Sequence, residues 1–301
     1  MTVPTYAVWT FTGLYGVDLG GESRLDLSQG FFLSKPTSLL LSARSRYDLS
    51  DAKFEEVEKI GCFLVHEEFL PVLRGPERDQ KIQAYQNGLM AFQILKPLRT
   101  LGVIFQGNNI ASGQFNLETT YHRAPMEPGQ WALLHTFDTS QISQIPDLIQ
   151  KVQKVMQGSK AETKNAIYLL QMALEHNNPL IAGLLGVMGL EAIFNSQNRN
   201  EFRGSLSKCL GESAHIFADW NSAAGLSPPS YTVDDNAIPL YMLRSKIAHG
   251  ADLREAARDP KYPVDFLKPV PLAGGLPQRN YSLLLSEAAI YLLGQVLQKV
   301  I

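Results

Sequence analysis

The chain has 301 residues, 45% of them hydrophobic, which is enough to bury two ordinary cores or one large core and excludes a disordered protein. Its 27 lysine and arginine residues nearly balance 29 acidic residues, and the formal net charge of −2 excludes a global basic field that recruits nucleic acid. Any RNA contact must therefore be local. The two cysteines, Cys62 and Cys209, lie far apart in no metal-binding or redox motif, so we expect reduced thiols in a cytoplasmic protein.

The sequence gives no sign of a membrane segment. The start MTVPTYAVWTF lacks both the basic residues and the continuous apolar run of a signal peptide. The longest uncharged apolar stretch, residues 179–190, is too short to span a bilayer and contains glycines. We therefore expect a soluble protein with no membrane partner.

Residues 1–140 predict a domain of mixed strands and helices whose role no motif indicates. Aromatic and β-branched residues alternating with glycine pairs predict strands within residues 5–41, and further strands are expected at 61–70, 101–106, 114–122 and 131–137. Two helices are expected among them. Residues 50–59 begin with an N-cap and an acidic turn, and residues 78–95 carry apolar side chains at helical spacing.

Residues 141–301 predict a second domain that is all helical. Helical patterns cover residues 141–157, 163–176, 179–194, 198–220 and 280–301, with a weak break at Gly158 and Ser159 and a long proline-rich connection over residues 251–278. The segment 180–194 is apolar almost all round, which predicts a buried central helix. The expected fold class is α+β, a mixed amino-terminal domain followed by a helical bundle.

The stretch from Asp234 to Gly250, DDNAIPLYMLRSKIAHG, predicts a further helix with the densest set of candidate functional residues. Its start is placed just before Pro239, because proline is tolerated in a first turn and residues 234–236 are all good N-caps. Its end is placed near His249, since Gly250 can adopt the left-handed conformation that closes a helix. Three apolar residues at helical spacing are expected to face the core: Leu240, Leu243 and Ile247.

Arg244 and His249 are side-chain types that suit RNA cleavage without a metal. A histidine can take the proton of a ribose 2′-OH or give one to the leaving oxygen, and an arginine offers two donors to phosphate oxygens. The sequence contains no motif for nucleotide hydrolysis or metal-assisted hydrolysis, so we expect no cofactor and no metal. Glu191 is the carboxylate of an otherwise apolar helix and needs a partner if buried; Arg244 is the natural candidate.

The spacing of Arg244 and His249 resembles the Arg-x4-6-His signature of the HEPN superfamily, helical domains that include many metal-independent ribonucleases. The run LYMLRSKIAHG looks like the Leu-Arg-Ser-x-Ile-x-His-Gly run of the ApeA-like branch, and GLEAIF at residues 189–194 is similar to a Leu-Glu-Ala-Leu-Phe run on an earlier helix of that branch. The resemblance covers residues 159–301. It implies a HEPN-like bundle that acts as an endoribonuclease in stress response or anti-phage defence.

Structural roles for the same residues stay open. Arg244 can cap carboxylates between helices, and His249 can stabilise a helix carboxyl end through the macrodipole. Nuclease-competent HEPN members often carry Asn, Asp or His directly after the arginine, whereas Ser245 can bind a phosphate but cannot titrate. Tyr241 fits either base stacking or a bundle contact. Three functions therefore remain: a ribonuclease, a non-catalytic module that binds RNA or a nucleotide, or a dimerisation domain serving an amino-terminal sensor.

The geometry of an ideal helix separates the two candidate catalytic residues. Arg244 and His249 lie about 140° apart around one helix, which is too wide for a tight pair, so joint action requires either a distorted last turn or a second copy of the helix facing the first. Ala248, four residues after Arg244, leaves room for a second helix. We expect a two-fold symmetric homodimer that gathers two arginines and two histidines into one cleft, as the composite dimeric sites of the resembled family imply.

Overall fold

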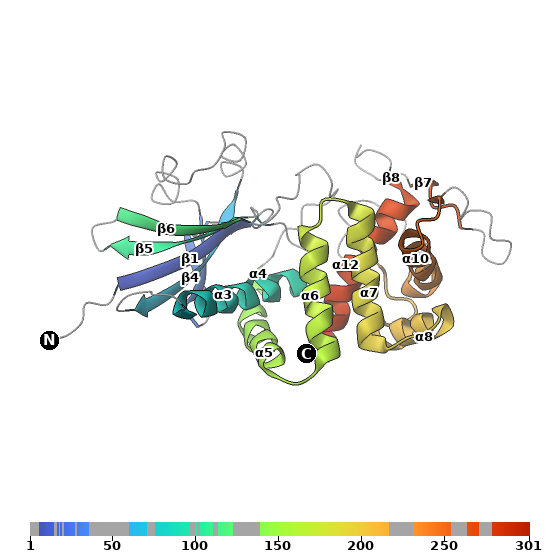
Figure 1. Cartoon of the computed structure of the whole chain (residues 1–301), viewed down its shortest axis with the longest axis horizontal. Helices are drawn as coiled ribbons and strands as arrows, with labels where there is room; N and C mark the ends of the chain where they lie inside the picture. Colours follow the sequence, from blue (N-terminus) through green and yellow to red (C-terminus); the bar gives the residue numbers. More distant parts are fainter. Residues whose placement is uncertain are drawn as a thin grey trace. The chain divides into compact units, whose positions relative to one another are not determined.

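The structure is a computed structural model, and it describes residues 6–14, 17, 19, 21–27, 29–35, 60–70, 76–96, 100, 103–110, 114–122, 139–216, 231–253, 264–270 and 279–301. The chain forms two compact units, one of residues 1–92, 98–126 and 134–157, and the other of residues 93–97, 127–133 and 158–301. The first unit carries a sheet and the second is chiefly helical (Figure 1), so the predicted α+β class is confirmed.

The first unit contains a six-stranded antiparallel sheet in the order β2-β3-β4-β1-β5-β6. The long central strand β1 pairs on both sides, with Thr10 opposite His66 of β4 and Gln106 of β5. The strands expected near residues 5–41, 61–70, 101–106 and 114–122 are thereby confirmed. Their bounds are β1 Tyr6–Leu14, β2 Arg24–Asp26, β3 Phe31–Ser34, β4 Cys62–Leu70, β5 Val103–Ile110 and β6 Gln114–His122.

The predicted helix at 78–95 is confirmed as α3, Pro76–Leu95. Its fully buried Tyr85 donates a hydrogen bond to the carbonyl of Leu64 in β4 at 3.0 Å, which fixes the helix against the sheet. The segment expected to form one helix at 141–157 is helical but divided into α4, Thr139–Ile142, and α5, Ile145–Gln157, so the expectation of a continuous helix is wrong. Pro146 causes the break, since it has no N–H to donate to the carbonyl of Ile142. The predictions for 50–59 and 131–137 lie outside the described residues.

Among its described residues, the second unit contains five helices and a short ladder of β7 with β8 that the sequence patterns do not predict. Its longest segment begins at Gly158, so α4 and α5 fall in the first unit, whereas the expected division after residue 140 passes through α4 and assigns α5 to the second. The helix expected over 198–220 ends at Leu210, because Gly211 follows with φ of 102°. The elements are α6 Ala161–Glu175, α7 Pro179–Phe194, α8 Arg199–Leu210, α10 Val233–Ala248, α12 Tyr281–Val300, β7 Pro269–Val270 and β8 Arg279–Asn280.

A stripe of glycines lets α7 pack closely on α12. A Cβ atom on Gly183 would lie 2.5 Å from Cα of Ser286, and one on Gly186 would lie 3.0 Å from the backbone of Ala289. α12 is the core helix of the unit. It is long and apolar enough to span a membrane by length and composition, yet 72% of that window is buried inside the protein.

The helix expected at 180–194 to be buried and central is α7, which is buried on one side only. Ile181 is 36% exposed and Met188 is 39% exposed, on the side of α7 that α12 does not cover. The glycine stripe is the reason: it turns the small residues of an almost uniformly apolar helix toward α12 and leaves larger apolar side chains on the opposite side.

Two details of α10 also differ from the sequence prediction. The helix begins at Val233 rather than near Pro239, with Thr232 as N-cap, and its hydroxyl accepts a hydrogen bond from the N–H of Asp235 at 3.2 Å. Pro239 therefore lies inside the helix. The preceding turns bury Val233 and Ala237, and that burial and the Thr232 cap offset the hydrogen bond lost at the proline. The predicted end is confirmed, since Gly250 has φ of 65° directly after the C-cap.

The glycine stripe predicts opposite effects for two glycine-to-alanine substitutions. Gly183→Ala should lower the unfolding free energy of the helical unit by about 1–3 kcal/mol, because the new methyl group collides with the backbone of α12. The control is Gly204→Ala on α8, where a Cβ meets nothing within 4 Å, and it should raise the unfolding free energy by about 0.5–1 kcal/mol. Urea unfolding followed by circular dichroism measures both, and equal effects would contradict close packing at Gly183.

Candidate functional site

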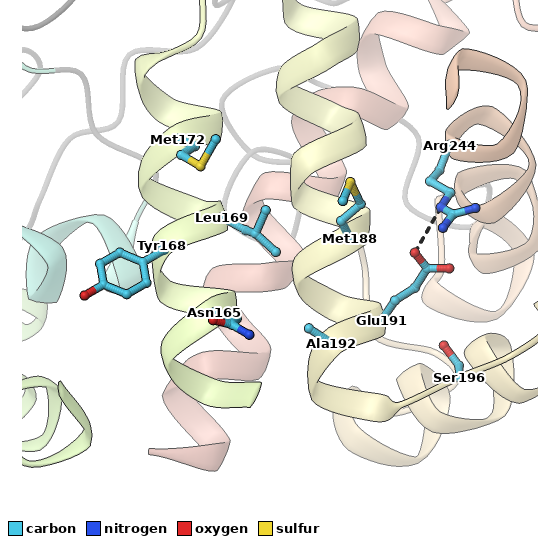
Figure 2. Close-up of a pocket in the computed structure, with 9 residues that line it drawn as sticks. All are labelled: Asn165, Tyr168, Leu169, Met172, Met188, Glu191, Ala192, Ser196 and Arg244. Carbon is cyan, nitrogen blue, oxygen red and sulfur yellow. Dashed lines mark ion pairs between the residues drawn. The ribbon is translucent and has the colours of Figure 1, made fainter. Parts of the chain in front are cut away.

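An ion pair between α7 and α10 forms the centre of the candidate site (Figure 2). Nε of Arg244 lies 3.0 Å from Oε2 of Glu191, and the side chains are 30% and 13% exposed, respectively. The partner predicted for the carboxylate of the apolar helix is therefore confirmed. The pair connects the two segments that carry candidate functional residues, GLEAIF and LYMLRSKIAHG.

The electrostatics of this pair follow from its partial burial. Burial raises the pKa of the Glu191 carboxyl, and the charge and hydrogen-bonding capacity of Arg244 counteract only part of that increase. Nε of Arg244 is buried but does not align with the carboxylate as a good hydrogen bond, so the contact is chiefly electrostatic. Among the described residues, the two terminal nitrogens of Arg244 have no hydrogen-bond partner and remain able to bind an anion.

An open groove of about 570 Å³ contains this ion pair. It lies over α6 and α7 and reaches Arg244 on α10 (Figure 2). Its lining mixes apolar side chains with a few polar groups, which is the usual chemistry of a binding site. The lining residues are Asn165, Tyr168, Leu169, Met172, Met188, Glu191, Ala192, Ser196 and Arg244.

The structure brings Tyr241 beside Arg244 but separates His249 from it. The Tyr241 ring packs against Phe202 with centroids 5.7 Å apart and lies 5.8 Å from the guanidinium carbon of Arg244, so it makes a bundle contact. His249 is the exposed C-cap residue of α10. Among the described residues, those that line the groove include neither Ser245 nor His249. His249 therefore lies outside the groove that contains Arg244.

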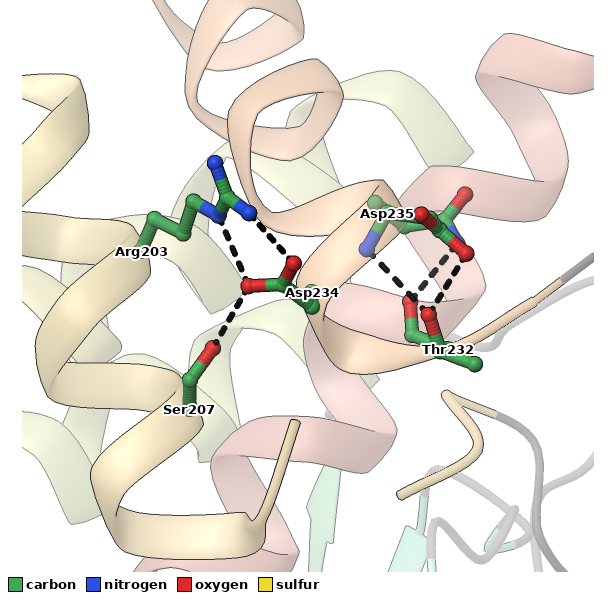
Figure 3. Close-up of polar contacts among 6 residues, drawn as sticks. Arg203, Ser207, Thr232, Asp234 and Asp235 are labelled. Carbon is green, nitrogen blue, oxygen red and sulfur yellow. Dashed lines mark hydrogen bonds and ion pairs between the residues drawn. The ribbon is translucent and has the colours of Figure 1, made fainter. Parts of the chain in front are cut away.

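Polar contacts at the start of α10 fix the helix that carries Arg244 (Figure 3). Nε of Arg203 on α8 donates to Oδ1 of Asp234 at 2.7 Å, and the hydroxyl of Ser207 donates to the same oxygen at 3.3 Å. These contacts hold the pKa of Asp234 below its ordinary value, chiefly through the hydrogen bond from Arg203. These contacts join α8 to α10, so we assign the cluster a structural role.

Sequence patterns did not single out the groove residues on α6 and the first residues after α7. Tyr168 and Met172 lie four residues apart on α6, and both are exposed. Their helical spacing and their large apolar side chains are the sequence signal that could have identified them. Ser196 has no sequence signal. Its hydroxyl oxygen is buried and lacks a hydrogen-bond partner among the described residues, which only the structure shows.

No protein family model, no curated protein and no solved structure matches the chain. Within the described residues, no group of three or more His, Cys, Asp and Glu side chains is placed to hold a metal ion. Any functional assignment therefore rests on the residues and geometry of the site itself.

The Glu191–Arg244 ion pair predicts an energetic coupling between the two helices. Glu191→Ala should lower the unfolding free energy of the helical unit by about 1–2 kcal/mol, because it leaves a half-buried guanidinium without its partner. In a double-mutant cycle with Arg244→Ala, we expect a coupling of about 0.5–1.5 kcal/mol. Strictly additive losses in urea unfolding would show that the ion pair does not form in solution.

Proposed function

We propose that the helical unit is a HEPN-type, metal-independent endoribonuclease. The supporting observation is the Glu191–Arg244 ion pair, because it joins the two separate sequence runs, one on α7 and one on α10, that resemble the ApeA-like branch. In this proposal Glu191 holds Nε of the guanidinium, and the terminal nitrogens bind the phosphate that is cleaved. By the same resemblance, the protein would act in stress response or anti-phage defence, and the two isolated cysteines favour a cytoplasmic location.

The proposed reaction needs only proton transfer and charge stabilisation. A base takes the proton of the ribose 2′-OH, the resulting oxygen attacks phosphorus, and the bond to the 5′ oxygen breaks as an acid gives that oxygen a proton. The products are a 2′,3′-cyclic phosphate and a 5′-OH. A histidine can serve as base or acid near neutral pH, and the arginine stabilises the charge that develops on the phosphate oxygens.

The proposed site is composite, with residues from two copies of the chain. Arg244 lies in the groove and His249 is exposed at the end of the same helix, so an intact set requires a second α10. Ala248 is exposed between them and leaves space for that helix. A two-fold axis beside α10 would bring the arginine of one chain toward the histidine of the other.

A non-catalytic module that binds RNA or a nucleotide is the second candidate. It is favoured by one observation, the position of His249 outside the groove that contains Arg244. Ser245, which cannot titrate at neutral pH, is consistent with this alternative.

The ribonuclease proposal predicts that His249→Ala lowers RNA cleavage by about 10² to 10⁴-fold, because proton transfer is lost. Arg244→Ala should also abolish cleavage, whereas Glu191→Gln should weaken it less because the guanidinium remains. The measurement is cleavage of total RNA by the purified protein in the presence of EDTA.

His176→Gln is the matched control, since His176 is a histidine of the same unit at the end of α6, outside the groove. It should cleave like the wild-type protein. Wild-type activity in the His249→Ala protein would remove that residue from the mechanism, and an inactive wild-type protein that still binds RNA would favour the second candidate.

A further inference from the structure

The groove that contains Arg244 extends far beyond the ion pair. From Arg244 on α10 it crosses the outer side of α7 at Met188 and reaches Tyr168 and Met172 on α6 (Figure 2). Its volume of about 570 Å³ falls within the range of about 300–1,000 Å³ typical of ligand sites. Charge stabilisation at one phosphate would need only the end of the groove at Arg244.

Large apolar side chains are exposed along this groove. Tyr168 is 46% exposed, Met172 is 53% exposed and Met188 is 39% exposed. Tyr168 and Met172 lie four residues apart and so share one side of α6. Contiguous exposed apolar surface is typical of a binding site, and an aromatic ring beside thioethers offers flat, polarisable contacts.

A cationic group lies at the α7–α10 side of the same groove. The terminal nitrogens of Arg244 have no hydrogen-bond partner among the described residues and are available there for an anion. A ligand that satisfies both ends of the groove therefore combines flat rings with an anionic group.

We propose that this groove holds the unpaired RNA segment next to the cleaved phosphate. Bases stack on Tyr168 and contact Met172 and Met188, while Arg244 binds a phosphate. This inference rests on the proposed ribonuclease function for the position of the cleaved phosphate. It adds that recognition depends on stacking of single-stranded bases.

The charge of the protein supports stacking as the main source of affinity. The net charge is −2, and Glu191 neutralises part of the charge of Arg244, so phosphate attraction alone is weak. A base stacked on an aromatic side chain contributes about 1–3 kcal/mol and needs no basic field. A single RNA strand supplies both a flat ring for Tyr168 and a phosphate for Arg244, which fits the mixed lining of the groove.

The test measures binding of a fluorescent hexauridylate by anisotropy in a His249→Ala background, which is expected to bind RNA without cutting it. Tyr168→Ala should weaken binding by about 5 to 100-fold, the loss of one stacked base, and Tyr168→Phe should bind within about two-fold of the parent. Leu267→Ala, which removes an exposed apolar side chain outside the groove, should change nothing. A hexamer without bases should bind weakly and equally to all four proteins.

Three results separate this inference from the ribonuclease proposal. Unchanged hexauridylate binding by Tyr168→Ala overturns the inference, even if the wild-type protein cleaves RNA through His249. Tyr168-dependent binding without any RNA cleavage by the wild-type protein supports the groove and rejects the ribonuclease. Light scattering that shows a changed oligomeric state for Tyr168→Ala, with RNA binding intact, would identify the groove as a protein interface and also overturn the inference.

Discussion

The close approach of α7 to α12 is the constraint on which the candidate site depends. Gly183, Gly186 and Gly189 supply no side chains to separate the helices, so the backbone of α7 packs directly on α12. The opposite side of α7 then carries Met188 outward, and Glu191 on the flank of the helix reaches Arg244 of α10. Tight packing on one side of the helix and an accessible, largely apolar groove on the other are thus two results of the same arrangement.

The ion pair positions Arg244, but the Glu191 carboxylate neutralises part of the positive charge of the guanidinium. A guanidinium held through Nε keeps its terminal nitrogens in a defined place, which favours two-point binding of a phosphate. The adjacent carboxylate weakens the local positive field, and the chain as a whole carries a net charge of −2. A phosphodiester site built here would therefore need additional positive charge, which a second Arg244 across a two-fold axis would provide.

Much of this arrangement could be predicted from the sequence, because several local signals were unambiguous. The alternation in the first unit predicts strands, and Glu191 in an apolar helix predicts a partner, which the structure shows to be Arg244. The start of α10 could not be predicted from the sequence. Thr232 and residues 234–236 are all suitable N-cap residues, and it is the burial of Val233 in the first turn that selects Thr232. The exposed side of α7 and the groove could not be predicted either, since an almost uniformly apolar helix carries no periodic signal for its orientation.

The measurement that tests the composite site most directly is subunit complementation between Arg244→Ala and His249→Ala. Each variant alone should be inactive toward RNA. After the two are mixed and exchange subunits, each heterodimer should contain an arginine from one chain and a histidine from the other, and the mixture should cleave more RNA than either parent. A mixture that is shown to contain heterodimers but cleaves no more RNA than its parents would contradict a site shared between chains.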